Sequence, residues 1–294
     1  MLQMSANRSQ TAKILRISWD EINRIMLRAV DRGLSRRQDE VISSIGMDEK
    51  NFLAGHSYVT VMTDNQGKRV IDVAENRDEN AVDTLWLGLS DKQRENVQSV
   101  CMDFWKAYIS GARRHAPQAD IVFDRFHVTK HLNEAVDKVR KKEHRELCRQ
   151  KNTSLSNTKY LWLKNPNNWT EKDRDRYAVL AENQLAVGRA WNRKELFREF
   201  WSLETINEAE VFFKHWYFSA THSRLKPVIE IAKMLNRHLE GLLAWIKHHV
   251  SNGLVEGFNS KIQQIKSIAR GFRDFKNYRI AILFHLGGLD MIPH

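Results

Sequence analysis

Cysteine is scarce in this chain of 294 residues, which contains only Cys101 and Cys148. The two lie far apart and lack CxxC spacing, so they cannot form a disulfide framework or a zinc ribbon. Cys101 lies in an apolar run typical of a buried strand, where we expect it to be a small core residue.

Long hydrophobic runs are lacking as well. The N-terminal Met-Leu-Gln-Met-Ser has no hydrophobic signal region, and no stretch approaches the length of a membrane span. Internal repeats and low-complexity tracts are also absent from the sequence. A cytoplasmic protein is therefore the expectation.

Acidic residues are fewer than basic ones: 36 Asp and Glu stand against 47 Lys and Arg, giving a formal net charge of +11. Such an excess can serve solubility alone. It can also neutralise phosphates, which provides most non-specific affinity for nucleic acids. A charge this far from balance favours a nucleic-acid partner, but it does not separate DNA from RNA.

The first half of the chain alternates strand and helix patterns. A mixed sheet covered by helices, an α/β fold, is the expected result. The expected strands are residues 41–47, 58–63, 68–74, 97–102 and 120–124, the second and third forming a hairpin around the turn 64–67, and the expected helices are residues 80–89 and 104–114.

Helical patterns dominate after residue 125, and a long basic helix is expected over residues 126–150. Ser18 and Glu21 form a capping-box pattern before an earlier helix, which fits either the end of a helix-turn-helix region or a simple packing helix. We therefore divide the chain into residues 1–40 as a DNA-binding remnant, 41–150 as the first part of a catalytic core with the basic helix, 151–248 as a helical insertion and 249–294 as the last part of the core.

Three acidic residues have positions that favour a metal site. Asp48 and Asp103 are each expected directly after a strand, and Glu256 opens an apolar-periodic helix. Neighbouring strand ends would bring two carboxylates so close that one takes up a proton unless a cation lies between them. Carboxylate oxygens are ligands that Mg²⁺ prefers, and two ions about 4 Å apart suit in-line displacement at phosphorus. Each acid also fits an ordinary strand-end or helix-start position.

Further candidates surround these acids. Asp124 and His127, three residues apart at a strand end, could serve the same site, although His127 fits equally well as a polar residue at a helix start. Asn259 lies on the same polar flank of its helix as Glu256. Basic residues for phosphate contact, with solvated helix faces as the alternative, are Lys130, His131, Lys138, Arg140, Lys141 and Lys142 on one helix, and Lys261, Lys266, Arg270, Arg273 and Lys276 near Glu256.

Five segments in order resemble a known family. They are Ile45-Gly-Met-Asp48-Glu, Val100-Cys-Met-Asp103 followed by Tyr108, Asp124-Arg-Phe-His127-Val, Val255-Glu-Gly-Phe-Asn259-Ser-Lys261 and Gly271-Phe-Arg-Asp-Phe275. Over residues 40–285 the chain is similar to the DDE-type transposases of the bacterial insertion-sequence family ISL3.

The resemblance implies a ribonuclease H-like core interrupted by an all-α insertion before the third acid. Asp48, Asp103 and Glu256 would be the metal-binding catalytic acids with Mg²⁺ or Mn²⁺, and Asp124, His127 and Asn259 would be accessory candidates. The implied chemistry is DNA strand cleavage and strand transfer by two-metal phosphoryl transfer. The implied partners are double-stranded terminal-repeat and target DNA and a second copy of the chain, with no membrane and no small-molecule substrate; when bound to DNA the protein would be nucleoid-associated.

One feature departs from the family pattern. Such transposases normally begin with a cysteine-rich zinc ribbon and a fuller helix-turn-helix region, neither of which this sequence contains. We therefore expect an N-terminally truncated copy. The alternatives are a DNA-binding remnant without transposition activity and a ribonuclease H-like nuclease with another substrate.

Overall fold

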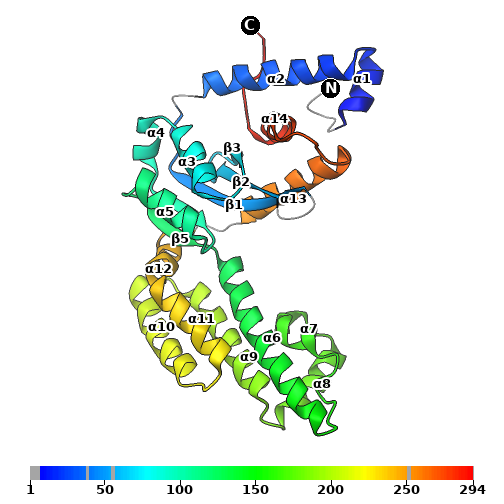
Figure 1. Cartoon of the computed structure of the whole chain (residues 1–294). Helices are drawn as coiled ribbons and strands as arrows, with labels where there is room; N and C mark the ends of the chain where they lie inside the picture. The colour runs from blue at the N-terminus through cyan, green and yellow to red at the C-terminus, as the bar shows by residue number, and fades with distance from the viewer. Residues whose placement is uncertain (1–6, 38–39, 54–56, 250–252, 294) are drawn as a thin grey trace. The chain divides into compact units, whose positions relative to one another are not determined.

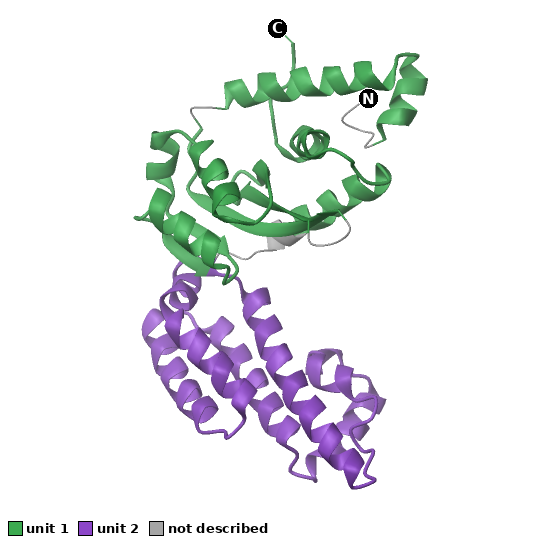
Figure 2. Cartoon of the chain, in the orientation of Figure 1, with its two compact units in different colours: residues 1–122, 250–294 green, residues 123–249 purple. Residues whose placement is uncertain are grey.

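A computed structural model describes residues 7–37, 40–53, 57–249 and 253–293, and for residues 253–256 the description covers the backbone only (Figure 1). The chain forms two compact units, one of residues 1–122 and 250–294 and one of residues 123–249 (Figure 2). The division falls at residue 122, whereas the sequence analysis grouped residues up to 150 with the core. The long basic helix belongs to the second unit because it packs on the helices there.

A five-stranded mixed sheet forms the centre of the first unit, as the sequence predicted. Its strand order is β3-β2-β1-β4-β5. β1 pairs antiparallel with β2 and parallel with β4. The strands are β1 (Ser44–Leu53), β2 (Ser57–Asp64), β3 (Arg69–Glu75), β4 (Ser99–Met102) and β5 (Asp120–Phe123). The α/β fold class is confirmed and is consistent with a ribonuclease H-like core.

The expectation that the first strand ends at Asp48 is wrong. β1 leaves β4 after the pair Gly46–Cys101, but it stays paired with β2 from Ile45 as far as Leu53. Asp48 therefore lies inside a strand, opposite Val61 of β2. The long antiparallel partner strand supplies the backbone hydrogen bonds that keep β1 extended after the parallel pairing has stopped.

Helices cover both faces of this sheet. Thr60 of β2 contacts Tyr108 of α5 (Lys106–His115), whereas Val61 packs with residues of α13 (Gly253–Ile268) and α14 (Phe275–Leu286). Because successive strand residues point to opposite faces, α5 and the α13–α14 pair lie on opposite sides of the sheet. α3 (Glu79–Leu87) packs beside α5, and α4 (Asp91–Asn96) is a short helix that the sequence analysis did not predict.

The N-terminal helices α1 (Arg8–Leu15) and α2 (Trp19–Arg36) belong to the first unit. The capping box of Ser18 and Glu21 is present, and the apolar stripe of α2 packs into the same core as α14. This is the packing role that the alternative interpretation of the N-terminal helix predicted.

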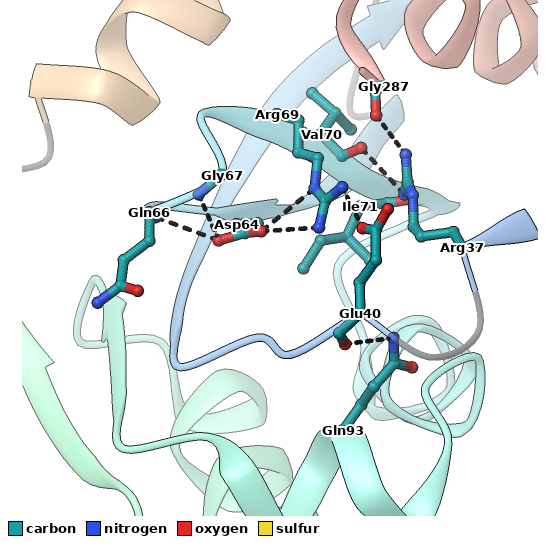
Figure 3. A network of polar contacts seen from close by, with 10 residues as sticks. All are labelled: Arg37, Glu40, Asp64, Gln66, Gly67, Arg69, Val70, Ile71, Gln93 and Gly287. Carbon is teal, nitrogen blue, oxygen red and sulfur yellow. Dashed lines mark hydrogen bonds and ion pairs between the residues drawn. The ribbon is translucent and has the colours of Figure 1, made fainter. Parts of the chain in front are cut away.

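A buried arginine joins the end of α2 to the sheet and to α14 (Figure 3). The Arg37 guanidinium donates hydrogen bonds to the carbonyls of Ile71 at 2.9 Å and Val70 at 3.4 Å, and to that of Gly287. Burial lowers the pKa of Arg37, and the neighbouring Arg69 lowers it further. Carbonyl dipoles therefore take the place of water around this buried charge.

The second unit is helical throughout its described elements. These are α6 (Arg125–Arg149), α7 (Lys159–Leu163), η2 (Pro166–Asn168), α8 (Glu171–Ala181), α9 (Ala186–Phe197), η3 (Arg198–Ser202), α10 (Ile206–Thr221), α11 (Lys226–Arg237) and α12 (Leu239–His248). Its core is rich in aromatic rings, such as the stacked Phe197 and Phe200. Among the described residues of the chain, no helix is both long and apolar enough to cross a membrane.

Candidate functional site

The first two predicted acids lie just beyond the point where the parallel strands separate. The last residue pair of β1 and β4 is Gly46 with Cys101. Asp48 and Asp103 each follow this pair by two residues, Asp48 within β1 and Asp103 directly after β4. The proximity of their carboxylates stays a prediction, and Asp48 lies within its strand rather than at its end.

Asp48 accepts two hydrogen bonds that fix its carboxylate. Its Oδ1 accepts the backbone N–H of Glu49 at 2.8 Å, and its Oδ2 accepts the side-chain amide of Asn259, on α13. Because an ionised carboxylate can only accept, the Asn259 amide must present Nδ2 to Asp48 and turn Oδ1 away.

The amide oxygen of Asn259 has no hydrogen-bond donor among the described residues. Asn259 is 9% exposed, and its Oδ1 is buried without such a partner in this part of the chain. Native proteins usually satisfy such an atom, and an exception has an explanation such as an ion or water at a functional site. A buried amide oxygen beside a candidate metal-binding carboxylate fits this explanation.

Asp103 is fixed by the turn that follows β4. Its Oδ1 accepts the backbone N–H of Trp105 at 2.8 Å, and α5 begins at the next residue. The carboxylate is therefore held between the end of a central strand and the start of a helix, two rigid elements.

The pKa of the buried Tyr108 phenol is raised in part by the negative charges of this region. Burial raises its pKa well above the ordinary value, and the carboxylates of Asp103, Glu49 and Asp48 raise it further; a hydrogen bond with Thr60 opposes them. The phenol and Thr60 Oγ1 lie 3.3 Å apart. Tyr108 is accordingly a neutral, buried group beside the acids rather than a base.

For the third predicted acid, Glu256, the structure describes the backbone but not the side chain, which lies outside the described residues. α13 begins at Gly253, so Glu256 lies in its first turn as the sequence predicted. Phe258, Ile262 and Ile265 are buried as expected.

The donor set can be tested against the implied metal. Among the side chains that the structure describes, no three His, Cys, Asp or Glu residues cluster in a way that could hold an ion. Asp48 and Asp103 nonetheless supply carboxylate oxygens, and Asn259 supplies a buried amide oxygen that has no hydrogen-bond partner among these side chains. These are the hard donors that Mg²⁺ and Mn²⁺ prefer, so the residues present fit such an ion.

Asp124 and His127 belong to the second unit and adopt the helix-start arrangement. Asp124 is the N-cap of α6 and accepts the N–H of Phe126 at 3.1 Å. His127 Nε2 lies 3.9 Å from Asp124 Oδ2. This geometry matches the interpretation of His127 as a polar residue at a helix start.

The predicted DNA-binding residues are in different surroundings. Lys130 and Lys261 are exposed, and Lys266 Nζ donates to the Asn51 carbonyl at 3.1 Å. Arg270 and Arg273 line a pocket of about 700 Å³. The expectation that Arg140 is on a basic surface is wrong, since this side chain is buried and its Nε donates to Asp137 Oδ1 at 2.8 Å.

Sequence reasoning missed two basic residues that share the pocket with Arg270 and Arg273. Lys13 and the buried Arg8 come from α1, and Arg8 Nη1 donates to Asn23 Oδ1 at 2.6 Å. Burial lowers the pKa of Arg8. No local pattern could have revealed this pairing, because Lys13 and Arg270 are 257 positions apart in sequence.

Known proteins similar to this chain agree with the motif resemblance. The chain is 25% identical over 284 residues to the transposase for insertion sequence element IS1001 of Bordetella parapertussis, covering 96% of this chain and 70% of that protein. It is also 25% identical over 297 residues to the transposase for insertion sequence element IS1557 of Mycobacterium tuberculosis, covering 92% of this chain and 66% of that protein.

A family comparison covers most of the chain. The ISL3 family of DDE transposases, described as a transposase family, matches residues 45–282. The matched range contains Asp48, Asp103, Glu256 and Asn259 in the order and setting described above. This chain therefore belongs to the ISL3 family of DDE transposases.

Proposed function

We propose that this chain cleaves and joins DNA strands as an insertion-sequence transposase, with Asp48, Asp103 and Glu256 as its catalytic acids. The reaction is phosphoryl transfer: water first attacks a phosphodiester at the element's end, and the freed 3′-hydroxyl then attacks target DNA. Double-stranded terminal-repeat DNA and target DNA are the substrates, and a homodimer or higher oligomer handles two ends together at the nucleoid.

One observation carries this proposal: the Asn259 amide holds the Asp48 carboxylate. This contact ties β1 to the helix whose first turn contains Glu256, so two of the three acids belong to elements locked together by a polar bond. Asp48 and Asp103 each follow the last pair of the parallel strands β1 and β4 by two residues, which supports a common centre.

The three acids would hold Mg²⁺ or Mn²⁺, which would supply positive charge at the phosphate and a more acidic bound water. The chain's own residues do the rest. Asn259 orients Asp48 through its N–H, and the backbone N–H of Trp105 orients Asp103. Such fixed orientation matters because catalytic groups lose rate steeply when misplaced by about 1 Å.

Basic side chains would bind the DNA backbone outside this centre. Arg270 and Arg273 share their pocket with Arg8 and Lys13, and Lys261 is exposed on α13. Each such phosphate contact adds salt-dependent affinity without sequence preference. Lys130 and Lys266 are further proposed DNA-binding residues, and Lys266 also holds the end of β1. Asp124 and His127 are proposed as accessory residues.

The test compares the wild-type chain with Asp48→Asn, Asp103→Asn and Glu256→Gln on end-labelled DNA from the termini of the encoding element, in Mn²⁺. Each variant should cleave at least about 100-fold more slowly, since a lost metal ligand removes several kcal/mol of transition-state stabilisation. Asp91→Asn, which changes an exposed acid on α4, is the matched control. Fluorescence anisotropy measures DNA binding in parallel.

Equal cleavage by wild type and the three variants would disprove the assignment of the acids. A wild-type chain that binds the DNA but never cleaves it would instead favour the DNA-binding remnant, and cleavage of unrelated DNA or RNA with equal rate would favour a general nuclease.

A further inference from the structure

A cation lies over two aromatic rings close to the candidate centre. The guanidinium carbon of Arg77 is 4.3 Å from the ring centroid of Tyr58 and 4.5 Å from that of Trp105. Arg77 Nη1 also donates to Glu49 Oε2 at 2.8 Å, and this bond raises the pKa of Arg77. The arginine is therefore a fixed cation, held from the side by a carboxylate and stacked against rings.

Trp105 is the outermost ring of this cluster, and it is rigid. Its indole Nε1 donates to the Arg77 carbonyl at 2.8 Å, and its backbone N–H donates to Asp103 Oδ1 at 2.8 Å. The residue is nevertheless 39% exposed. The indole is therefore oriented by its Nε1 hydrogen bond and by Arg77, and part of its surface stays open to solvent, where another ring can stack.

The chemistry of this indole surface limits the kind of ligand that can bind to it. An indole with a cation against its π-system and its N–H already bonded offers a flat apolar area and no free donor. The ligand that it suits is a planar, π-rich ring that can stack without hydrogen bonds. Nucleobases meet this requirement whatever their sequence, because every base has a π-face.

The location of Trp105 beside the candidate acids limits which nucleotide could stack on it. Trp105 is two residues from Asp103 and bonded to it, and Glu49, which anchors Arg77, follows Asp48 directly. A phosphodiester held at these acids would bring its own nucleotides to this cluster. A base inside a duplex is already stacked on both sides. The nucleobase that stacks on Trp105 must therefore belong to an unpaired or extruded nucleotide.

We propose that Trp105, supported by Arg77 and Tyr58, is a stacking platform for one unpaired nucleobase next to the phosphate that is cut. This proposal rests on the function proposed above. The platform holds the strand that carries the reacting phosphate and favours DNA whose end is already opened.

The test uses short duplexes with one unpaired 2-aminopurine at the end, and fully paired duplexes of the same sequence, in EDTA so that no cleavage occurs. The wild-type chain should quench the 2-aminopurine fluorescence on binding, because a stacked fluorophore is quenched. Trp105→Ala should lose the quenching and bind the unpaired end about fivefold to 100-fold more weakly, while its affinity for the paired duplex stays unchanged.

Two further variants separate stacking from folding. Trp105→Phe keeps a ring and should restore most of the quenching and affinity. Phe218→Ala, which removes an exposed ring of α10 in the second unit, should behave as wild type. Circular dichroism spectra of the variants establish that they are folded.

Equal quenching and affinity for wild type and Trp105→Ala would overturn the platform, whatever the cleavage assays show. Loss of affinity for paired and unpaired ends alike would also overturn it, since the ring would then serve structure. If the wild-type chain never cleaves DNA in Mn²⁺ but the quenching depends on Trp105 in EDTA, the proposed function fails and the base-binding site stands.

Discussion

The hydrogen bond between Asn259 and Asp48 can be tested by a substitution that replaces this attraction with a repulsion. In Asn259→Asp the N–H donor to Asp48 is replaced by a second carboxylate at hydrogen-bond range. Two unit charges 4 Å apart in an effective dielectric of 20 repel by about 4 kcal/mol. A hydrogen bond to a charged group worth about 1.5–3 kcal/mol is lost as well. Relaxation of the side chains reduces the sum, and we expect a local loss of about 2–4 kcal/mol.

Hydrogen exchange of backbone amides in β1 and α13 measures this loss locally. A local readout is needed because a chain with two compact units need not unfold in one step. Since 1.4 kcal/mol corresponds to a factor of ten, protection of these segments should fall by at least about 30-fold at pH 7 in EDTA. Gln263→Glu adds the same charge at an exposed position of the same helix and should change protection less than threefold.

Mn²⁺ supplies the second arm of this experiment. A dication between facing carboxylates turns their repulsion into attraction, so saturating Mn²⁺ should restore much of the protection lost in Asn259→Asp and leave Gln263→Glu unaffected. If Asn259→Asp and Gln263→Glu exchange equally in EDTA, the contact between Asn259 and Asp48 does not exist in solution. If the deficit is present but insensitive to Mn²⁺, the contact is structural and the metal assignment is wrong.

Three other outcomes follow from the structure. Arg37→Met should destabilise the first unit by about 2–4 kcal/mol in urea unfolding, because three buried carbonyls lose their donor. The control Arg36→Met removes an exposed ion pair and should cost less than about 1 kcal/mol. Burial holds the pKa of His131 below 6.5. As the pH falls below 6.5, the unfolded chain therefore takes up a proton at His131 that the folded chain does not, and stability should fall. His131→Gln should flatten this dependence of stability on pH. Gly67→Ala should lower the melting temperature, since its Cβ would lie 2.3 Å from Asp64 Oδ2.

Local patterns predicted the elements that carry most of the site. The hairpin of β2 and β3 was predicted from two β-rich runs around a turn, and it forms because Asp64 accepts the backbone N–H groups of Gln66 and Gly67. The helix with Phe258 and Ile262 was predicted from its apolar spacing, and it is buried on that stripe. Periodicity of this kind is written along the chain and needs no partner to be read.

Contacts between distant segments were beyond these patterns. β1 continues past Asp48 because β2 pairs with it as far as Leu53, and a single strand gives no sign of where its partner ends. Arg140 belongs to a run of basic residues, but helix packing buries it with Asp137. Composition marks a residue as charged, whereas its neighbours in space decide whether that charge meets water or a carboxylate.

The sequence by itself determined the scarcity of cysteine, the basic charge, the α/β pattern and the spacing of Asp48, Asp103 and Glu256, since each depends only on residue type and order. Tertiary structure decided that Asn259 holds Asp48 and that Arg77 supports an exposed Trp105 beside Asp103. Asn259 and Asp48 are separated by 211 positions. Their contact forms because the folded core packs α13 on the sheet, and no local preference of either segment encodes that packing.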